Sequence, residues 1–339
     1  MEEKKRILIT GASGFIGGFL VKEALKRGYD VWAGIRQGSS REHLTDERLH
    51  FIDLQYNNEA ELTKQLREVV SFSGAWHFVV HNAGITKSLH TADFYKVNAS
   101  YVKTLIESLA NADCKPEKFL LMSSLSSYGP VAEHSFRPIR IDDEQRPDSM
   151  YGKSKLHAEH FLKIQTHFPY IILCPTGVYG PGDKDYLMEI KSIKSGIDLK
   201  VGMKPQRISF IFAEDLAVAT FLALENPAAC NTAYFVADGD VYTDHEFAAI
   251  VKKLLGKHFV VNLRIPMWMC YVACACSEFA GKILKKPMTL NMDKYKILRQ
   301  RNWVCETDRT FCDLGFIPLV NLEKGLEKTI LYNKKHGFL

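Results

Sequence analysis

Short apolar runs alternate with amphipathic helical patterns through the first half of this chain. Residues 6–10 form an apolar run that is typical of a strand covered on both faces. Apolar positions then recur with helical spacing over residues 14–27, and Gly28 ends that pattern. The same alternation predicts strands over residues 31–35, 49–54, 76–80, 118–122 and 170–174, and helices over residues 58–70, 92–111 and 149–167. This order predicts an α/β fold with a doubly wound parallel sheet.

The regular alternation ends after Pro175. A helical pattern over residues 214–225 and a strand pattern over residues 232–236 indicate that a later segment returns to the sheet. The rest of the second half predicts a smaller, mostly helical C-terminal lobe for the substrate, interleaved with the sheet domain. The expected limits are residues 1–175 for the sheet domain, about 205–237 for the returning segment and 176–339 for the lobe.

Composition limits the class of protein. The chain has 339 residues, enough for one large domain and a smaller lobe. Its net charge of +5 is mild and no long basic run occurs, so we expect no nucleic acid as partner. The N-terminal residues lack a signal-peptide pattern, and the longest apolar stretch, residues 265–275, is shorter than the roughly 20 residues that cross a bilayer. These features predict a cytoplasmic protein without an integral membrane span.

The eight cysteines are scattered along the chain, without a CxxC pair or a Cys/His cluster at zinc spacing. A disulfide needs two Cys residues that the fold brings together, and a zinc site needs clustered ligands such as Cys and His. The sequence therefore predicts reduced, mostly buried thiols and no metal site.

A glycine-rich turn joins the first predicted strand to the first predicted helix. Gly11, Gly14 and Gly17 let the backbone approach a pyrophosphate closely, and the helix N-terminus offers unpaired N–H groups to it. The alternative is a tight turn that serves packing alone. In this strand–turn–helix setting the pattern predicts a Rossmann-type dinucleotide site. The cofactor contacts predicted from this turn are Gly11, Ser13, Gly14, Phe15, Ile16 and Gly17.

The end of the second predicted strand bears on the choice between NAD and NADP. NAD-binding folds place an acidic residue there, on the ribose 2′-hydroxyl. This chain has Arg36, whose guanidinium suits a 2′-phosphate, so NADP is favoured over NAD; the alternative is a solvated basic loop with Arg41. Asp53, after the third strand, would accept from the adenine amino group or cap the loop. The other cofactor contacts predicted at strand ends are Leu54, Asn82, Ala83 and Gly84.

Three residue types suited to alcohol–ketone chemistry follow. Tyr151 and Lys155 stand four apart on a predicted helix and share a face. A neighbouring ammonium and an oxidised nicotinamide would both favour the phenolate and lower the tyrosine pKa from about 10. Ser124, with Ser123 as its competitor, would hydrogen-bond the reacting oxygen. Asn98 would hold the backbone or a water near the site, or be an ordinary helix residue.

These motifs resemble the extended short-chain dehydrogenase/reductase family, within the NAD-dependent epimerase/dehydratase superfamily. The matching stretches are TGASGFIG at residues 10–17, SSLSSYG at 123–129, YGKSK at 151–155 and CPTGVYGPGD at 174–183. The resemblance implies a catalytic triad of Ser124, Tyr151 and Lys155 with Asn98 in support, and frequent homodimers through two helices of the sheet domain. It also implies nicotinamide contacts from Pro175, Thr176 and Val178.

The branch of the family is less sharply marked. Family members that are sugar-nucleotide 4,6-dehydratases typically have an Asp-Glu pair directly after the serine or threonine of the triad. The resemblance places Leu125 and Ser126 there, so this chain lacks the carboxylates that drive elimination. Phe212 replaces a histidine frequent in epimerases, and Arg207 stands one position early for their diphosphate contact. Arg207 would bind an anionic substrate or pair with Glu214 or Asp215. The stretches similar to 3β-hydroxysteroid dehydrogenases and dihydroflavonol reductases are residues 265–280, 286–290, 303–305 and 313–318.

The sequence thus predicts an NAD(P)-dependent oxidoreductase that transfers a hydride between nicotinamide and a secondary alcohol or ketone. A steroid- or flavonol-like apolar small molecule is the favoured substrate. One alternative is a nucleoside-diphosphate-sugar epimerase using the same triad, and another is a non-catalytic nucleotide-sensing protein. The apolar stretch from residue 265 leaves three interpretations open: a pocket wall, a peripheral membrane contact or a core helix.

Overall fold

Seven parallel strands form the central sheet. The computed structural model describes residues 4–165, 168–286 and 288–339. The strands run in the order β3-β2-β1-β4-β5-β6-β11, which is a doubly wound arrangement and confirms the predicted fold class. Their bounds are Arg6–Thr10 (β1), Asp30–Gly34 (β2), His50–Ile52 (β3), Phe78–His81 (β4), Lys118–Met122 (β5), Tyr170–Pro175 (β6) and Thr232–Val236 (β11).

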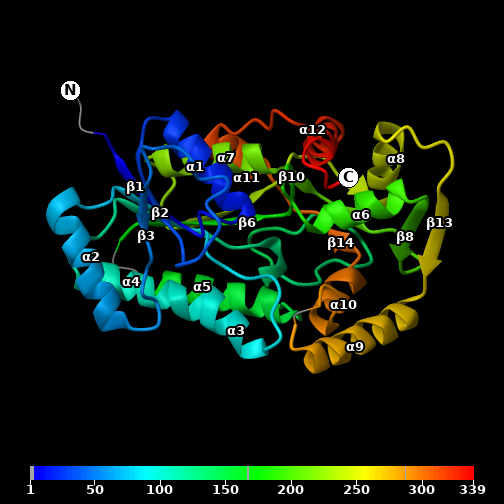
Figure 1. The fold of residues 1–339 in the computed structure, drawn as a ribbon, viewed down its shortest axis with the longest axis horizontal. Helices are drawn as coiled ribbons and strands as arrows, with labels where there is room; N and C mark the ends of the chain where they lie inside the picture. The colour runs from blue at the N-terminus through cyan, green and yellow to red at the C-terminus, as the bar shows by residue number, and fades with distance from the viewer. Residues whose placement is uncertain (1–3, 166–167, 287) are drawn as a thin grey trace.

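Helices cover both faces of this sheet, as Figure 1 shows. The helices α1 (Phe15–Lys26) and α7 (Ala213–Glu225) lie on one face, and α2 (Glu59–Ser73), α4 (Tyr101–Asn111) and α5 (Met150–Gln165) lie on the other. In β1, Ile7 and Ile9 belong to one core cluster while Leu8 belongs to the other. The strand is apolar throughout because its alternate residues enter two different hydrophobic layers.

The predicted helix over residues 92–111 is interrupted. It consists of α3 (Thr91–Tyr95), a π-helical turn (Lys96–Ser100) and α4. A π-helical turn re-aims the side chains it carries and is frequent at functional sites. Asn98 lies in this turn.

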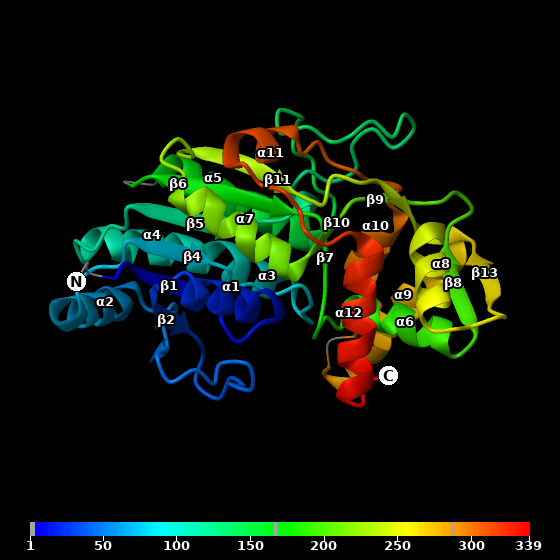
Figure 2. The ribbon, with the colours of Figure 1, turned by 90° about the horizontal axis from the view of Figure 1, so that it is seen from above.

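The smaller lobe lies beside the carboxyl ends of the sheet strands (Figure 2). Its helices are α6 (Asp185–Lys194), α8 (Asp244–Leu254), α9 (Met267–Leu284), α10 (Met292–Arg299) and α12 (Leu322–Lys335). Its short strands pair as β8 (Ile197–Val201) with β13 (Val261–Ile265), β7 (Gly177–Tyr179) with β10 (Phe210–Phe212), and β9 (Arg207–Ile208) with β12 (Tyr242–Thr243) and β14 (Asn302–Trp303). The chain returns to the sheet domain with α7 and β11, and again with α11 (Asp308–Leu314), which packs on both.

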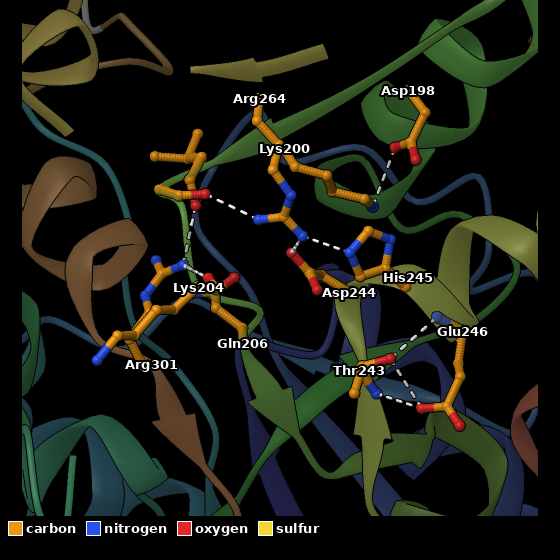
Figure 3. A network of polar contacts seen from close by, with 12 residues as sticks. Asp198, Lys200, Lys204, Gln206, Thr243, Asp244, His245, Glu246, Arg264 and Arg301 are labelled. Carbon is orange, nitrogen blue, oxygen red and sulfur yellow. Dashed lines mark hydrogen bonds and ion pairs between the residues drawn. The ribbon is translucent and has the colours of Figure 1, made fainter. Parts of the chain in front are cut away.

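Buried and half-buried cations hold this lobe together (Figure 3). Arg264 of β13 donates to the Gly202 carbonyl oxygen at 2.8 Å and faces the Asp244 carboxylate. Lys200 of β8 lies 2.8 Å from Glu189 and 3.1 Å from Asp198. Buried charges of this kind are stable only when paired. These cations therefore link β8 to α6 and β13 to α8 through ion pairs.

Arg301 acts in the same way between the lobe and the start of β14. Its guanidinium donates to the carbonyl oxygens of Val201 and Lys204 at 2.8 and 3.0 Å, and to Arg299 at 3.0 Å. A guanidinium has five N–H donors, so these backbone contacts use much of its capacity. Arg301 therefore serves the fold of the lobe.

Candidate functional site

A cleft of about 1980 Å³ runs along the carboxyl end of the sheet, between the β1–α1 turn and the smaller lobe. Ligands of open α/β sheets bind at this edge. The predicted site residues that line the cleft are Gly11, Ser13, Gly14, Phe15, Ile16, Arg36, Asp53, Leu54, Asn82, Ala83, Gly84, Ser124, Tyr151, Lys155, Pro175, Thr176 and Val178. Its volume is larger than that of an ordinary small-molecule pocket, about 300–1,000 Å³, and suits a dinucleotide together with a substrate.

The glycine turn closes one end of the cleft in the geometry that a pyrophosphate needs. Gly11 has φ +64°, a left-handed conformation that favours glycine. No side chain caps α1, so the N–H groups of its first turn face the cleft with the positive end of the helix dipole. The turn therefore fits the phosphates of a dinucleotide.

Gly17 has a different role from the one predicted. It lies outside the cleft lining, and a Cβ built on it would stand 2.1 Å from the Gly11 carbonyl oxygen. The absence of a side chain allows α1 to pack directly on the turn. Gly17 shapes the phosphate site from behind and does not contact the cleft.

The adenosine end of the cleft contains both residues predicted there. Arg36 is exposed and lines the cleft after β2, next to Ser39, Ser40 and His43. The Asp53 carboxylate accepts from the Gln37 N–H at 2.9 Å, which ties the loop after β2 to the end of β3. Asp53 thus has the loop-capping contact that was one of its two predicted roles.

Two other charged residues near these strands, Arg41 and Asp30, lie outside the part of the cleft that Arg36 lines. Arg41 stacks on the Phe51 ring, with its guanidinium carbon 4.2 Å from the ring centroid. Asp30 begins β2, at the opposite end of the strand, and lies 3.0 Å from His50. Arg36 is therefore the arginine of this loop that is directed to the cleft.

Ser124 and Tyr151 meet at the centre of the cleft. Both residues line the cleft, and the Ser124 hydroxyl lies close enough to the Tyr151 phenol to favour its ionised form. The Ser124 Oγ accepts from the Ser126 N–H at 3.2 Å. The Ser123 hydroxyl instead donates to the buried carboxylate of Glu159, on α5. Only Ser124 of the pair is placed to contact a reacting oxygen beside Tyr151.

Lys155 lies one helical turn behind the tyrosine. It is buried, donates to the Met122 carbonyl oxygen at 2.8 Å, and has its Nζ 6.0 Å from the Tyr151 ring centroid. Burial lowers the pKa of Lys155 to about 8, although the Glu159 carboxylate opposes this shift.

The pKa of Tyr151 does not follow the simple expectation from the Tyr–Lys pair. Burial raises the pKa of its phenol above the usual value, and the nearby Ser124 hydroxyl only partly opposes this. Lys155 thus does not lower the pKa of Tyr151 in the way that the sequence analysis expected. A further positive charge in the cleft, such as an oxidised nicotinamide, would favour the phenolate.

Asn98 supports the site without lining the cleft. Its Oδ1 accepts from the Ile85 N–H at 2.8 Å, and its Nδ2 donates to the Ile85 carbonyl oxygen at 3.0 Å and to Ser154 Oγ at 2.9 Å. The side chain therefore fixes the loop after β4 to the helix that carries Tyr151. A Cβ on Gly84 would stand 3.1 Å from Asn98 Oδ1 and 3.3 Å from Lys155 Nζ, so a side chain at this position would crowd both residues.

Asp293 is a site residue that the sequence analysis missed. Its carboxylate, on α10 of the smaller lobe, accepts from the backbone N–H groups of Met150 at 2.5 Å and Tyr151 at 3.2 Å. Lys296, on the same helix, donates to the Asp148 carbonyl oxygen at 2.9 Å. The lobe thus caps the start of the helix that carries Tyr151, and no local pattern relates residues 142 or 143 positions apart in sequence.

The lobe end of the cleft has an apolar wall with charged residues beside it, among them Lys184, Glu189 and Lys294. One ion pair lies at its edge, with Lys87 Nζ 2.7 Å from the Asp185 carboxylate. The large apolar residues of the wall are Met188, Leu199, Ile208, Met288, Leu290, Ile297, Leu298 and Trp303. This wall suits an apolar or partly apolar ligand beside Tyr151.

Two expectations for the substrate region are wrong. Arg207 lies outside the cleft lining and stacks on Phe136 at 4.9 Å, whereas Asp215 accepts from the N–H groups of Leu319 and Val320. Glu214 faces Lys22 and Lys328 instead of Arg207. The expected pairing fails because β9 directs Arg207 away from the start of α7.

The helix α9 is also not a core helix. Trp268 is 68% exposed and Phe279 is 67% exposed, and Ser277 is the residue of α9 that lines the cleft. Most of the apolar surface of α9 therefore lies neither in the core nor in the wall of the cleft, which were two of the three interpretations of this stretch.

Comparison with known proteins agrees with the motifs. A 3-beta-hydroxysteroid dehydrogenase of Mycolicibacterium neoaurum is 24% identical, over 96% of this chain and 91% of its own length. A UDP-glucose 4-epimerase of Vibrio cholerae is 28% identical, over 96% of this chain and 94% of its own length. Among solved structures, the UDP-glucuronic acid 4-epimerase of Bacillus cereus in complex with NAD has the same fold, with a TM-score of 0.76, 21% identity and coverage of 98% of this chain and 99% of its own.

The sequence profile of the NAD dependent epimerase/dehydratase family matches residues 7–237. That range contains the glycine turn, the Ser124–Tyr151–Lys155 cluster and the segment that returns to the sheet. The predicted resemblance is thereby confirmed, and the chain belongs to the NAD dependent epimerase/dehydratase family of extended short-chain dehydrogenases/reductases, a family of enzymes.

Proposed function

We propose that this enzyme is an NADP-dependent oxidoreductase that interconverts a secondary alcohol and a ketone. The observation that carries the proposal is that Ser124, Tyr151 and buried Lys155 line the same cleft, with Lys155 Nζ 6.0 Å from the centroid of the Tyr151 ring. A phenol, a hydroxyl and an ammonium in this arrangement can bind a carbonyl oxygen and exchange a proton with it.

Each of these residues has one task. In reduction Tyr151 donates its proton to the carbonyl oxygen, and in oxidation it takes the proton of the hydroxyl group. Ser124 donates a hydrogen bond to the same oxygen. Lys155 would hold the nicotinamide ribose, and the positive charge of the oxidised cofactor would favour the phenolate. Asn98 is a positioning residue that holds the loop after β4 against α5. The nicotinamide, when bound, supplies or accepts the hydride at the carbon atom.

The substrate proposal rests on the lobe end of the cleft. Its apolar wall favours a steroid- or flavonol-like molecule over a sugar nucleotide. A sugar-nucleotide diphosphate is best held by the bidentate donors of arginine, and Arg207 and Arg301 are both absent from the cleft lining; the cations at this end are Lys87, Lys184 and Lys294. The substrate is therefore a small molecule with an apolar skeleton and one secondary alcohol or ketone.

The preference for NADP rests on Arg36. Its exposed guanidinium follows β2, where a ribose 2′-phosphate would lie, and no acidic residue occupies that position. The Bacillus cereus structure is a complex with NAD, so the preference for NADP is proposed from Arg36 alone. A homodimer and a cytoplasmic location remain predictions.

Replacing Tyr151 by phenylalanine tests the proposal. Loss of the proton donor is expected to lower kcat for ketone reduction by about 10²- to 10⁴-fold while leaving the Kd for NADPH nearly unchanged. Tyr95→Phe is the matched control because Tyr95 packs on His157 outside the cleft. An active Tyr151→Phe enzyme would refute the assignment.

A nucleoside-diphosphate-sugar epimerase is the second candidate, because the Vibrio cholerae relative is an epimerase over nearly the full chain. An epimerase retains its cofactor between two half-reactions. Denaturing the purified protein and measuring released nucleotide separates the two: stoichiometric NAD favours the epimerase, and freely exchanging NADP favours the reductase. A nucleotide-sensing protein would bind cofactor yet turn over neither ketones nor sugar nucleotides.

A further inference from the structure

The outer surface of α9 is unusually apolar for an exposed helix. Of the 22 large hydrophobic side chains that are exposed among the described residues, seven lie on this one helix. They are Trp268, Met269, Tyr271, Val272, Phe279, Ile283 and Leu284, and we call this set the α9 face. An exposed apolar surface of this kind marks an interaction site.

The α9 face has a continuous stripe. Trp268, Val272, Phe279 and Ile283 follow one another at spacings of four, seven and four residues, which places them on one side of a helix. Cys270, Cys274 and Gly281 are buried on the opposite side, and α10 lies on the inner side of α9 (Figure 1). One face of α9 therefore packs on the lobe, and the apolar stripe on its other face is exposed.

Positive charge is concentrated next to this stripe. Lys282, Lys285 and Lys286 are exposed at the C-terminal end of α9. Residues 259–290 contain four Lys or Arg and one acidic residue, a net charge of +3 out of +5 for the whole chain. The acidic residue, Glu278, accepts from the Met292 N–H at 2.9 Å and faces Lys282 at 3.0 Å.

The fourth cation of this segment is directed elsewhere. Arg264 faces into the lobe, toward Asp244 and the Gly202 carbonyl oxygen (Figure 3). The surface beside the α9 face therefore presents Lys285 and Lys286, while Lys282 shares its charge with Glu278. Its partner should combine an apolar layer with negative charge.

From this charge pattern we infer that the α9 face binds an anionic lipid surface. The apolar stripe would enter the boundary between headgroups and acyl chains, while the lysines contact lipid phosphates. Among the described residues, no helix meets the length and apolarity needed to cross a bilayer, so the contact is peripheral. A second copy of this face would be a poorer partner because it offers the lysines no free carboxylate. The inference does not depend on the reaction catalysed.

Vesicle co-sedimentation of the full chain tests this inference. We expect binding to phosphatidylcholine vesicles with 30% phosphatidylglycerol, weakening as salt rises, and little binding to phosphatidylcholine alone. The triple variant Lys282→Gln/Lys285→Gln/Lys286→Gln should bind the anionic vesicles on the order of tenfold to 100-fold more weakly. Phe279→Gln should also weaken binding, whereas Phe72→Gln, which removes an exposed apolar residue on α2, should leave it unchanged.

A folded-state control accompanies each variant, namely thermal unfolding with and without NADPH. The fluorescence of Trp268 provides a second readout, which needs no substitution in the protein under test. Its emission should shift to the blue on anionic vesicles, and Trp268→Phe should lack this shift. Equal binding to both vesicle types, or no loss in the lysine and Phe279 variants, would overturn the inference. So would a dimer in solution that Phe279→Gln converts to a monomer.

Discussion

Removing the Asp293 carboxylate should slow catalysis without weakening cofactor binding. In Asp293→Ala the N–H groups of Met150 and Tyr151 lose their acceptor at the start of α5. Loss of a helix N-cap costs about 0.5–2 kcal/mol, and a carboxylate at a helix N-terminus contributes about 0.3–1 kcal/mol. If the upper limit of the cap energy, about 2 kcal/mol, positions the Tyr151 phenol, its loss lowers kcat by up to about 30-fold, since about 1.4 kcal/mol corresponds to a factor of ten.

Steady-state kinetics with a ketone substrate and NADPH measure this effect. We expect a fall in kcat with an unchanged Kd for NADPH, and faster hydrogen–deuterium exchange in residues 149–152. Asp293→Glu should recover part of the rate because it restores an acceptor. Asn58→Ala is the matched control, since Asn58 caps α2 through the Glu61 N–H and lies outside the cleft lining.

The exchange measurement separates this prediction from the proposed reaction, because it needs no substrate. If exchange at residues 149–152 is unchanged in Asp293→Ala, the cap does not hold the first turn of α5 and the reasoning is wrong. If exchange rises but kcat falls no more than in Asn58→Ala, Asp293 stabilises the fold without positioning Tyr151.

Three further substitutions test other parts of the site. Gly17→Ala should cost about 1–3 kcal/mol of stability through overpacking and weaken NADPH binding, whereas Gly18→Ala, whose Cβ would meet only an atom at 3.8 Å, should be tolerated in thermal-shift titrations. Arg36→Asp should change the ratio of kcat/KM for NADPH over NADH at least tenfold toward NADH, and Arg41→Asp should not change it. Burial raises the pKa of Asp238 from 3.8 to about 7, so the wild type loses stability as the pH rises between these values. At pH 8 the free energy of unfolding of Asp238→Asn should therefore exceed that of the wild type by about 1 kcal/mol or more, which is measured as a higher unfolding temperature. At pH 4 the two proteins should unfold at a similar temperature.

The sheet and the cofactor half of the cleft were predictable from sequence because their signals are local. Buried parallel strands are apolar throughout, and the turn after β1 needs glycines at fixed positions. Tyr151 and Lys155 share a face because a helix brings residues four apart together. Each of these relations is set within one strand, one turn or one helix.

Other parts of the site depend on contacts between elements. Ser123 and Ser124 are equivalent in sequence, and only the position of Glu159 on α5 engages the first and leaves the second for Tyr151. Likewise, a helical pattern over residues 92–111 does not reveal the π-helical turn that aims Asn98 at Ile85. Gly17 was assigned to the cofactor because its packing distance to Gly11 is not visible in the motif.

The sequence by itself determined the strand and helix order, the phosphate-binding turn and the pairing of a tyrosine with a lysine. The tertiary structure alone decided that α10 caps the helix that carries Tyr151, that Arg207 lies outside the cleft lining and that the apolar stripe of α9 faces outward. The physical reason is that a periodic pattern fixes which side of an element is apolar. Whether another part of the chain covers that side depends on how distant segments pack, and a one-dimensional pattern holds no distance between them.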